Sequence, residues 1–485
     1  MSEKYGKKSV VGNFIWRFLE RVGAQGVTLL VSIILARIIE PSVFGTVALI
    51  TVITAILQVF VDSGLGVALI QKKDADELDF SSVFMFNMVV CTALYAVMYF
   101  CAPLIADFYQ IPELVPLTRV SSLTLVISGL KNIQQAYVSR HMMFKRFFFA
   151  TLTGTIGAAV IGIWMAYHGY GAWAIVVQNL FNKTVDTIIL WFTVKWRPRL
   201  MFSWGRLKKL LSFGWKMLVA AFLDKTYTEL RQLIIGKMYS SADLAYYNKG
   251  QHFPGAIVNN VNTSIDSVLL PVMSKAQDNV NDVRSMMRRS IRISSYIMAP
   301  LMIGLAAAGT VFIRLVLTAK WMECVLFMQI FCITYLFQPI QTANLNAIKA
   351  MGRSDLFLKL DVIKKSVGMA VLLSTMWFGA KAIAYGLLAT SLFNQIINAW
   401  PNKRLLNYSY PEQIRDIAPN LLLALGMGVV VYCIGLLGMP DLVTLPLQML
   451  VGVVIYVAGS ILTKNSSFKY LLKILKSMKR KKVKA

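Results

Sequence analysis

Runs of about 20 or more mainly apolar residues follow one another along almost the whole chain. A hydrocarbon layer about 30 Å thick is crossed by about 20 residues of α-helix, because each residue advances about 1.5 Å. Lipid offers the backbone no hydrogen-bond partners, so a chain with such runs crosses the layer as helices. Of the 485 residues 57% are hydrophobic and 15% are charged, whereas about 25% are charged in an ordinary soluble domain. The sequence therefore predicts an all-α integral membrane protein.

The boundaries of these runs predict about fourteen transmembrane helices. The second and the eighth are the least uniform in composition and could be broken or tilted. In chain order, the predicted spans cover residues 10–39, 42–71, 81–104, 115–138, 146–168, 171–194, 210–237, 250–273, 290–314, 322–348, 357–379, 382–402, 413–437 and 442–463.

Basic residues are unevenly distributed between the connections. The 50 Lys and Arg against 23 Asp and Glu give a formal charge of +27. An excess of Lys and Arg marks the cytoplasmic side of a membrane protein, so we expect both termini in the cytoplasm. Since the bias explains the charge, no nucleic-acid partner is expected. The basic clusters lie at residues 4–8, 72–73, 140–146, 195–209, 284–292, 353–365, 403–415 and in the tail.

The sequence does not bring residues together in the patterns that catalysis requires. The three histidines, His141, His168 and His252, are far apart, and no pair of carboxylates lies in a loop large enough to form a site. The five cysteines lie inside apolar runs without a CxxC pair, and no Walker A lysine loop occurs. We expect no enzyme activity, no cofactor and no metal site.

A weak internal repeat divides the chain. Residues 36–45 resemble residues 236–245, and residues 61–65 resemble residues 265–269, about 200 residues later. The repeat predicts an N-terminal lobe of six spans and a C-terminal lobe of six spans in the same orientation, and such transporters bind substrate between their halves. The tail is either an amphipathic helix on the anionic leaflet or a solvated segment. The predicted divisions are 1–204 for the first lobe, 205–405 for the second, 406–464 for two extra spans and 465–485 for a basic cytoplasmic tail.

Two motifs resemble those of a known family. The first is Leu35-Ala36-Arg37 followed by Pro41-x-x-Phe44-Gly45-x-x-Ala48-Leu49, and the second is the run from Ala350 to Leu356. Both resemble the polysaccharide-exporter (PST) branch of the multidrug/oligosaccharidyl-lipid/polysaccharide transporter superfamily. The resemblance implies a two-lobed helical bundle whose central cavity is lined chiefly by spans one, two, seven and eight.

The same resemblance implies a function. A polyprenyl-diphosphate-linked oligosaccharide would be flipped from the cytoplasmic to the outer leaflet by alternating access. Membrane lipids, and polymerase or assembly proteins of polysaccharide synthesis, would be further partners. A peptidoglycan-precursor or multidrug transporter of the same superfamily is the alternative, and a scaffold role within a glycan-assembly complex is another. A drug exporter is disfavoured because cationic drugs require acidic rather than basic residues in the interior.

Charged residues inside spans cost about 2.5–3.5 kcal/mol each on insertion scales, so they indicate function. A diphosphate requires cations where it is dehydrated, and Arg offers phosphate a bidentate fork. Near the cytoplasmic face the basic side chains could instead extend to the interface. The candidate substrate-binding cations are Arg17, Arg21, Lys131, Lys216, Lys225 and Arg231.

Four acidic residues accompany these cations. Asp62 and Asp266 are equivalent in the repeat and either carry a coupling ion or balance the cations of the first span, with balance favoured. Asp224 and Glu229 could neutralise the nearby cations of the seventh span. Asp186 lies one turn from Lys183, and the two are expected to form a structural pair.

Overall fold

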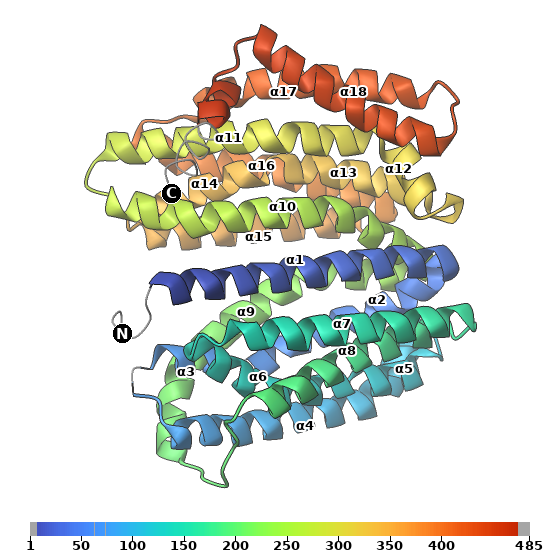
Figure 1. Cartoon of the computed structure of the whole chain (residues 1–485), viewed down its shortest axis with the longest axis vertical. Coiled ribbons are helices and arrows are strands. Elements are labelled where there is room, and N and C mark those ends of the chain that lie inside the picture. The colour runs from blue at the N-terminus through green and yellow to red at the C-terminus, as the bar shows by residue number, and fades with distance from the viewer. Residues whose placement is uncertain (1–6, 63, 73, 474–485) are drawn as a thin grey trace. The chain divides into compact units, whose positions relative to one another are not determined.

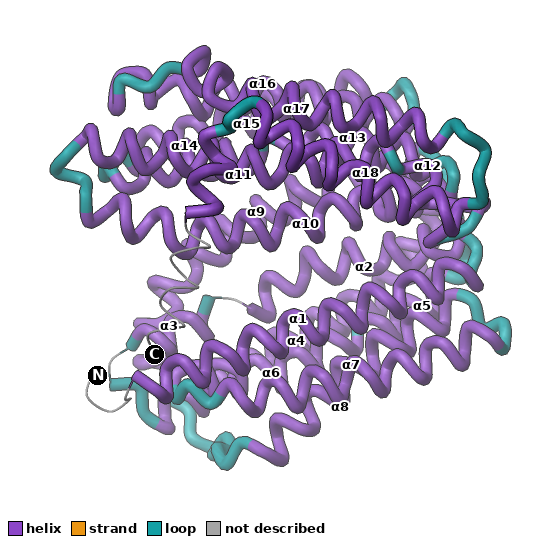
Figure 2. Tube along the Cα trace, turned by 45° about the horizontal axis from the view of Figure 1, so that its top comes forward, coloured by secondary structure: helices purple, strands orange, loops and turns teal. Residues whose placement is uncertain are grey.

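The computed structural model of the protein describes residues 7–62, 64–72 and 74–473, and all regular structure in these ranges is helical (Figure 1). Loops gather at the ends of the helices (Figure 2). The elements are α1 (Lys7–Ile38), α2 (Pro41–Asp62), α3 (Leu65–Gln71), α4 (Glu77–Tyr109), α5 (Leu114–Ser121), α6 (Leu123–Arg140), α7 (Phe144–Tyr167), α8 (Ala172–Thr193), α9 (Trp204–Met238), α10 (Ser241–Lys275), α11 (Val280–Ala307), α12 (Gly309–Val316), the 3₁₀ turn η1 (Ala319–Trp321), α13 (Cys324–Leu336), α14 (Gln338–Ala350), α15 (Ser354–Thr375), α16 (Ala380–Leu406), α17 (Tyr410–Gly435) and α18 (Asp441–Leu462).

Each predicted span coincides with one helix or with one interrupted helix. Within the described ranges, 8 helical segments are both long and apolar enough to cross a membrane. The protein is therefore an all-α integral membrane protein, as the sequence predicts. Helices α8, α9, α10, α15 and α16 have the length but are more polar, and α1 contributes the shorter apolar segment Gly23–Ile38, so the full count of spans stays a prediction.

Several spans are interrupted. The second is divided between α2 and α3, where Gly64 adopts a left-handed conformation with φ of 66°. The fourth is divided at Ser122, whose hydroxyl donates to the Thr118 carbonyl, and the tenth at Phe337. The eighth, α10, is continuous although it contains Pro254 and Pro271. Breaks in the fourth and tenth spans fall at corresponding places of the internal repeat.

By compactness, the chain divides into a unit of Met1–Ala245 and a unit of Tyr246–Ala485. Compactness and internal repetition are different criteria, so the lobe boundary at residues 204 and 205 stays a prediction. We call these parts the N-terminal unit and the C-terminal unit.

In the N-terminal unit, α7 packs against α1 and α8, and α9 packs against α2, α3 and α4. A core of large side chains includes Phe80, Phe147 and Trp196. Arg140 of α6 donates to the carbonyls of Leu69 (2.7 Å) and Lys72 (2.6 Å) at the end of α3. A basic side chain satisfies the unpaired carbonyls of a helix end well, so this arginine has a structural role beyond setting orientation.

Two glycines allow very close helix contacts in this unit. A Cβ added to Gly45 of α2 would lie 1.6 Å from the carbonyl oxygen of Ser241, at the first residue of α10. One added to Gly236 of α9 would lie 2.3 Å from a methyl carbon of Leu49. Small residues let membrane helices approach backbone to backbone. Both glycines belong to the repeated segments. The close contact at Gly45 explains why the first family-like motif has a glycine at this position.

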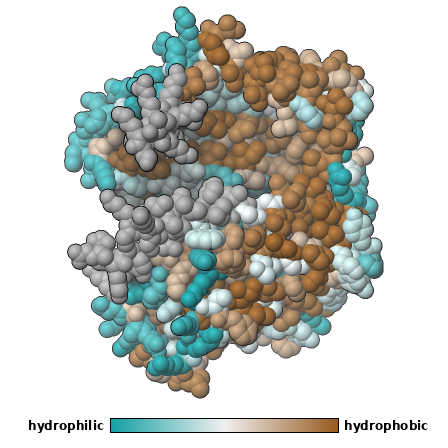
Figure 3. Space-filling model, in the orientation of Figure 1, coloured by the Kyte–Doolittle hydropathy of each residue, from teal (hydrophilic) through white to brown (hydrophobic). Residues whose placement is uncertain are grey.

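In the C-terminal unit, α17 packs between α11 and α18. Buried Met287, Ile291, Ala343 and Tyr408 belong to its core. Many large apolar side chains of α17 and α18 are exposed, as is usual for surfaces that face acyl chains. On the face in Figure 3, apolar residues gather over the middle of the helices, and polar residues collect toward their ends.

Candidate functional site

Helix α9 carries most of the candidate residues. Lys225 donates to Glu229 (Nζ to Oε1, 2.6 Å), and Gln232 donates to the other oxygen of the same carboxylate (2.5 Å). Glu229 is buried, with 8% of its surface exposed. Lys225 is thus compensated within its own helix. This geometry favours the structural interpretation for Lys225, and its role in binding stays a proposal.

Arg231 differs from Lys225. It is 7% exposed, and its guanidinium lies 5.4 Å from the centre of the Tyr227 ring. Among the residues that the structure describes, no carboxylate forms an ion pair with it. Burying a charge without a counter-charge is unfavourable, and an aromatic face compensates only part of the cost. Arg231 therefore has the properties expected of a group whose partner is an anionic ligand.

The contacts of the other candidate cations in α1 and α9 are less well defined. Lys216 and Asp224 are exposed on α9. Arg17 and Arg21 lie in α1, but their side chains fall outside the described parts of the structure. Their assignment stays a prediction.

Lys131 of α6 forms an ion pair with Asp186 of α8, and both side chains are largely buried. Lys131 rather than Lys183 makes the direct ion pair with Asp186, and Lys183 interacts with that carboxylate at longer range. Asp62, bonded to Gln58 at 3.2 Å, is within electrostatic reach of both lysines. The two acids and two lysines balance one another, which supports a structural pair at Lys131.

The repeat-related acids have similar surroundings. Asn346 of α14 donates to Asp266 of α10 (2.7 Å). In the other half of the repeat, Asn132 of α6 donates to the carbonyl of Val61 in α2 (2.7 Å), beside Asp62. In each case an asparagine from an interrupted span holds the segment that carries the acid. A coupling-ion role for either acid stays a prediction.

An apolar cavity of about 400 Å³ in the C-terminal unit had no counterpart in the sequence predictions. Its lining comes from α10, α11, α12, α17 and α18 and includes Leu301, Gly304, Met427, Gly452 and Val453. No single sequence window brings these residues together, and a membrane helix is apolar on most faces. The cavity has the chemistry to hold a hydrocarbon chain.

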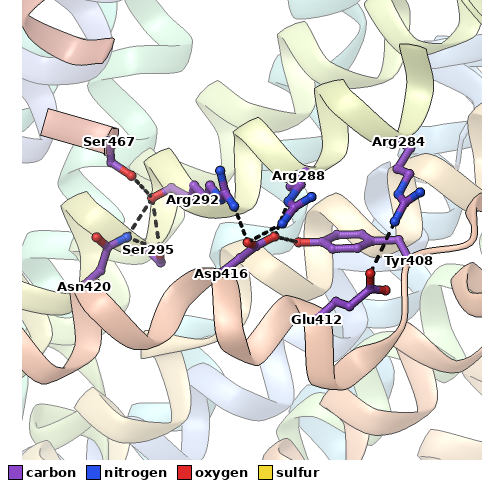
Figure 4. Close-up of polar contacts among 9 residues, drawn as sticks. All are labelled: Arg284, Arg288, Arg292, Ser295, Tyr408, Glu412, Asp416, Asn420 and Ser467. Atoms are coloured by element: carbon purple, nitrogen blue, oxygen red, sulfur yellow. Dashed lines mark hydrogen bonds and ion pairs between the residues drawn. The ribbon is translucent and has the colours of Figure 1, made fainter. Parts of the chain in front are cut away.

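A polar network between α11 and α17 was also missed (Figure 4). Asp416 accepts two hydrogen bonds from Arg288 (2.5 and 2.8 Å), one from Arg292 and one from the Tyr408 hydroxyl (2.7 Å). Glu412 pairs with Arg284 (3.3 Å). The three arginines recur every four residues, as do the two acids, and this spacing could have indicated two facing helices.

Replacing Asp416 with Ala leaves two guanidiniums without their anion and the fully buried Tyr408 hydroxyl without its acceptor. The arginine side chains are 41% and 36% exposed, so water compensates part of the loss. We expect the free energy of unfolding to fall by about 2 kcal/mol, measured by denaturation of the detergent-purified protein. Asp355→Ala, which breaks the exposed pair with Arg353, is the control and should change little. Equal effects of the two variants would contradict this role for Asp416.

A second ion-pair cluster lies in the connection before α4. Arg206 of α9 is bonded to Asp76 and lowers the pKa of that carboxyl to about 2. Lys72 donates to buried Asp79 (2.5 Å), and Asp76 caps α4. The charges of this cluster pair with one another, so we assign them to the fold rather than to a ligand.

The long apolar helices define a multi-span membrane protein, and its fold resembles that of a solved flippase. The lipid II flippase MurJ, in its inward closed conformation, has a TM-score of 0.75 to this chain at 15% identity, covering 94% of this chain and 99% of that chain. The profile of the polysaccharide biosynthesis protein family matches residues 34–326, more than half of the chain, so the protein belongs to that family.

Two curated relatives agree with this assignment. The teichuronic acid biosynthesis protein TuaB of Bacillus subtilis (strain 168) is 24% identical over 79% of this chain and 80% of its own length. The lipopolysaccharide biosynthesis protein WzxC of Escherichia coli (strain K12) is 23% identical over 89% of this chain and 88% of its own. The resemblance stated from the two sequence motifs is confirmed.

Proposed function

We propose that this protein moves a polyprenyl-diphosphate-linked oligosaccharide from the cytoplasmic to the outer leaflet, for the synthesis of cell-surface polysaccharide. It is a transporter and not an enzyme. The family match, the biosynthetic names of the relatives and the flippase fold support this proposal. The bacterial inner membrane, with both chain termini in the cytoplasm, is the proposed location.

The observation that carries the proposal is the buried guanidinium of Arg231, which forms no ion pair within the described residues. A diphosphate brings at least two negative charges into a region where water is scarce. A guanidinium donates two parallel hydrogen bonds to phosphate oxygens and stays protonated even when buried. Arg231 is therefore proposed as the main diphosphate contact, with Lys216, Arg17 and Arg21 as further cations on the path.

The lipid part of the cargo requires a different surface. The apolar cavity of the C-terminal unit, about 400 Å³, is proposed to hold part of the polyprenyl chain. A cargo that combines a charged diphosphate with a long hydrocarbon chain fits a protein that offers both kinds of site. Alternating access between the predicted lobes would then carry the head group across, with polymerase or assembly proteins as proposed downstream partners.

A peptidoglycan precursor is the second candidate cargo, because the solved neighbour with the same fold is a lipid II flippase. Both cargoes share the diphosphate that Arg231 would bind. The names of the sequence relatives favour the polysaccharide cargo. A cationic drug is not favoured, since it would be repelled by Arg231.

Complementation tests the choice of cargo. The wild-type gene is expressed in bacterial strains that lack a flippase for lipid-linked oligosaccharide and, separately, in a strain depleted of its lipid II flippase. We expect surface polysaccharide to return in at least one of the former, while lipid II depletion stays lethal. Rescue of the lipid II strain alone, at equal protein levels, would overturn the polysaccharide assignment.

A further inference from the structure

A basic pocket lies where the chain after α18 folds back onto α11. It has a volume of about 270 Å³, and we call it the α11 pocket. The residues after α18 are helical from 466 to 473, and Ser467 donates to the Arg292 carbonyl (3.3 Å). The polar lining residues are the arginines Arg288, Arg289 and Arg292 with the hydroxyl-bearing Ser285, Ser466, Ser467 and Tyr470.

The charges of this pocket do not balance. Asp416 is shared between Arg288 and Arg292, so one negative charge faces two positive ones. Arg289, on the same turn of α11, is exposed, and its guanidinium lies 5.1 Å from the Tyr470 ring centre. Within the described ranges, no carboxylate is paired with Arg289. Three arginines against one acid leave an excess of two positive charges around one cavity.

The donors are also held in position. Asp416, which also accepts from the Tyr408 hydroxyl, fixes the guanidiniums of Arg288 and Arg292 from the buried side (Figure 4). Both side chains remain more than a third exposed, so the N–H groups not used by Asp416 are open to a ligand. Tyr470 fixes Arg289 from the tail side. Guanidiniums that are already held in place lose little conformational freedom when a ligand binds. Several such donors around one cavity suit an anion with several oxygens.

The excess of basic residues on the cytoplasmic side of membrane proteins could explain why basic residues occur here, but it does not explain why three arginines line one cavity. Lys469 and Lys473 are exposed basic residues of the same segment, and neither lines the cavity. The α11 pocket instead combines arginines, hydroxyls and an orienting carboxylate. We propose that it binds the phosphate of a phosphate ester, either the head group of an anionic lipid or a soluble ester. The α11 pocket shares no residue with the proposed diphosphate contacts, and its proposed role does not depend on the cargo.

Thermal unfolding of the full-length protein in detergent tests this site. Phosphatidylglycerol, phosphatidylcholine or glycerol phosphate is titrated, and the concentration for a half-maximal rise in Tm is recorded. For wild type we expect a rise with phosphatidylglycerol and little with zwitterionic phosphatidylcholine. Arg289→Gln removes a donor without breaking an ion pair and should raise the half-maximal concentration about tenfold. Arg289→Lys, which keeps the charge, should recover part of the affinity.

The matched control is Lys469→Gln, which also removes one positive charge, at an exposed residue of the segment after α18 that does not line the cavity, and should behave as wild type. A rise with phosphatidylglycerol alone supports a lipid head group, and an equal rise with glycerol phosphate supports a soluble ester. The proposal is wrong if no ligand raises Tm, or if Lys469→Gln weakens binding as much as Arg289→Gln.

Discussion

Arg231→Gln is expected to reduce transport by about ten- to a hundredfold while leaving the protein as stable as wild type or more stable. The loss follows from removing one or two charge-assisted hydrogen bonds to the diphosphate. The stability follows from the absence of an ion pair at Arg231 in the described structure, since replacing an uncompensated buried charge with a neutral side chain relieves its desolvation. Transport is measured by complementation, and stability by the Tm of the purified protein.

The opposite pattern would indicate a structural role. If Arg231→Gln lowers Tm and the protein level together with transport, the guanidinium stabilises the fold. If transport is unchanged at normal protein levels, Arg231 is not a substrate contact. Arg231→Lys should retain part of the activity, because it keeps the charge but loses the fork. Arg404→Gln, at an exposed arginine of α16, is the matched control and should transport as wild type.

Gly45→Ala is expected to destabilise the N-terminal unit strongly. The new Cβ would lie 1.6 Å from the Ser241 carbonyl oxygen, and because this is a backbone atom the helices themselves must separate. Overpacking of this kind costs about 3 kcal/mol, in spite of the better helix propensity of Ala. We expect a lower Tm, a lower protein level in the membrane and lost complementation.

Gly426→Ala provides the control for this change. Gly426 also lies inside a membrane helix, α17, but a Cβ there would meet nothing within 4 Å. The substitution should leave Tm unchanged or raise it, since Ala is favoured over Gly in a helix by about 1 kcal/mol. A Gly45→Ala variant as stable as Gly426→Ala would show that α2 and the start of α10 do not pass as closely as the structure has them.

Most of the helices could be predicted from the sequence, because a membrane span is encoded locally by the length of its apolar run. The breaks at Ser122 and Phe337 could not, because the apolar runs continue through them. The sequence predicts that most of the basic cluster at residues 284–292 lies in a connection, whereas α11 already begins at Val280. Polar first turns of a membrane helix have the composition of a connection, so hydropathy alone places the boundary too late.

The sites were predicted less completely, because they depend on which helices are neighbours. The pairing of Lys225 with Glu229 is local and followed from the i, i+4 spacing. The partners of Lys131 and Arg288 lie on other helices, 55 and 128 residues away, and no spacing rule reaches them.

The sequence predicts that the tail lies either on the membrane surface or in solvent. Its described part instead packs on α11, with the Phe468 ring 6.3 Å from that of Tyr296.

Lipid flipping in liposomes tests the central claim most directly. The full-length protein is reconstituted with a fluorescent polyprenyl-diphosphate oligosaccharide, and a membrane-impermeant quencher reports how fast label from the inner leaflet becomes accessible. We predict that wild type and Arg404→Gln accelerate this exchange well above protein-free liposomes and that Arg231→Gln does not. Exchange at the protein-free rate with folded wild type, across several oligosaccharides, would contradict the assignment of this protein as a flippase for lipid-linked oligosaccharides.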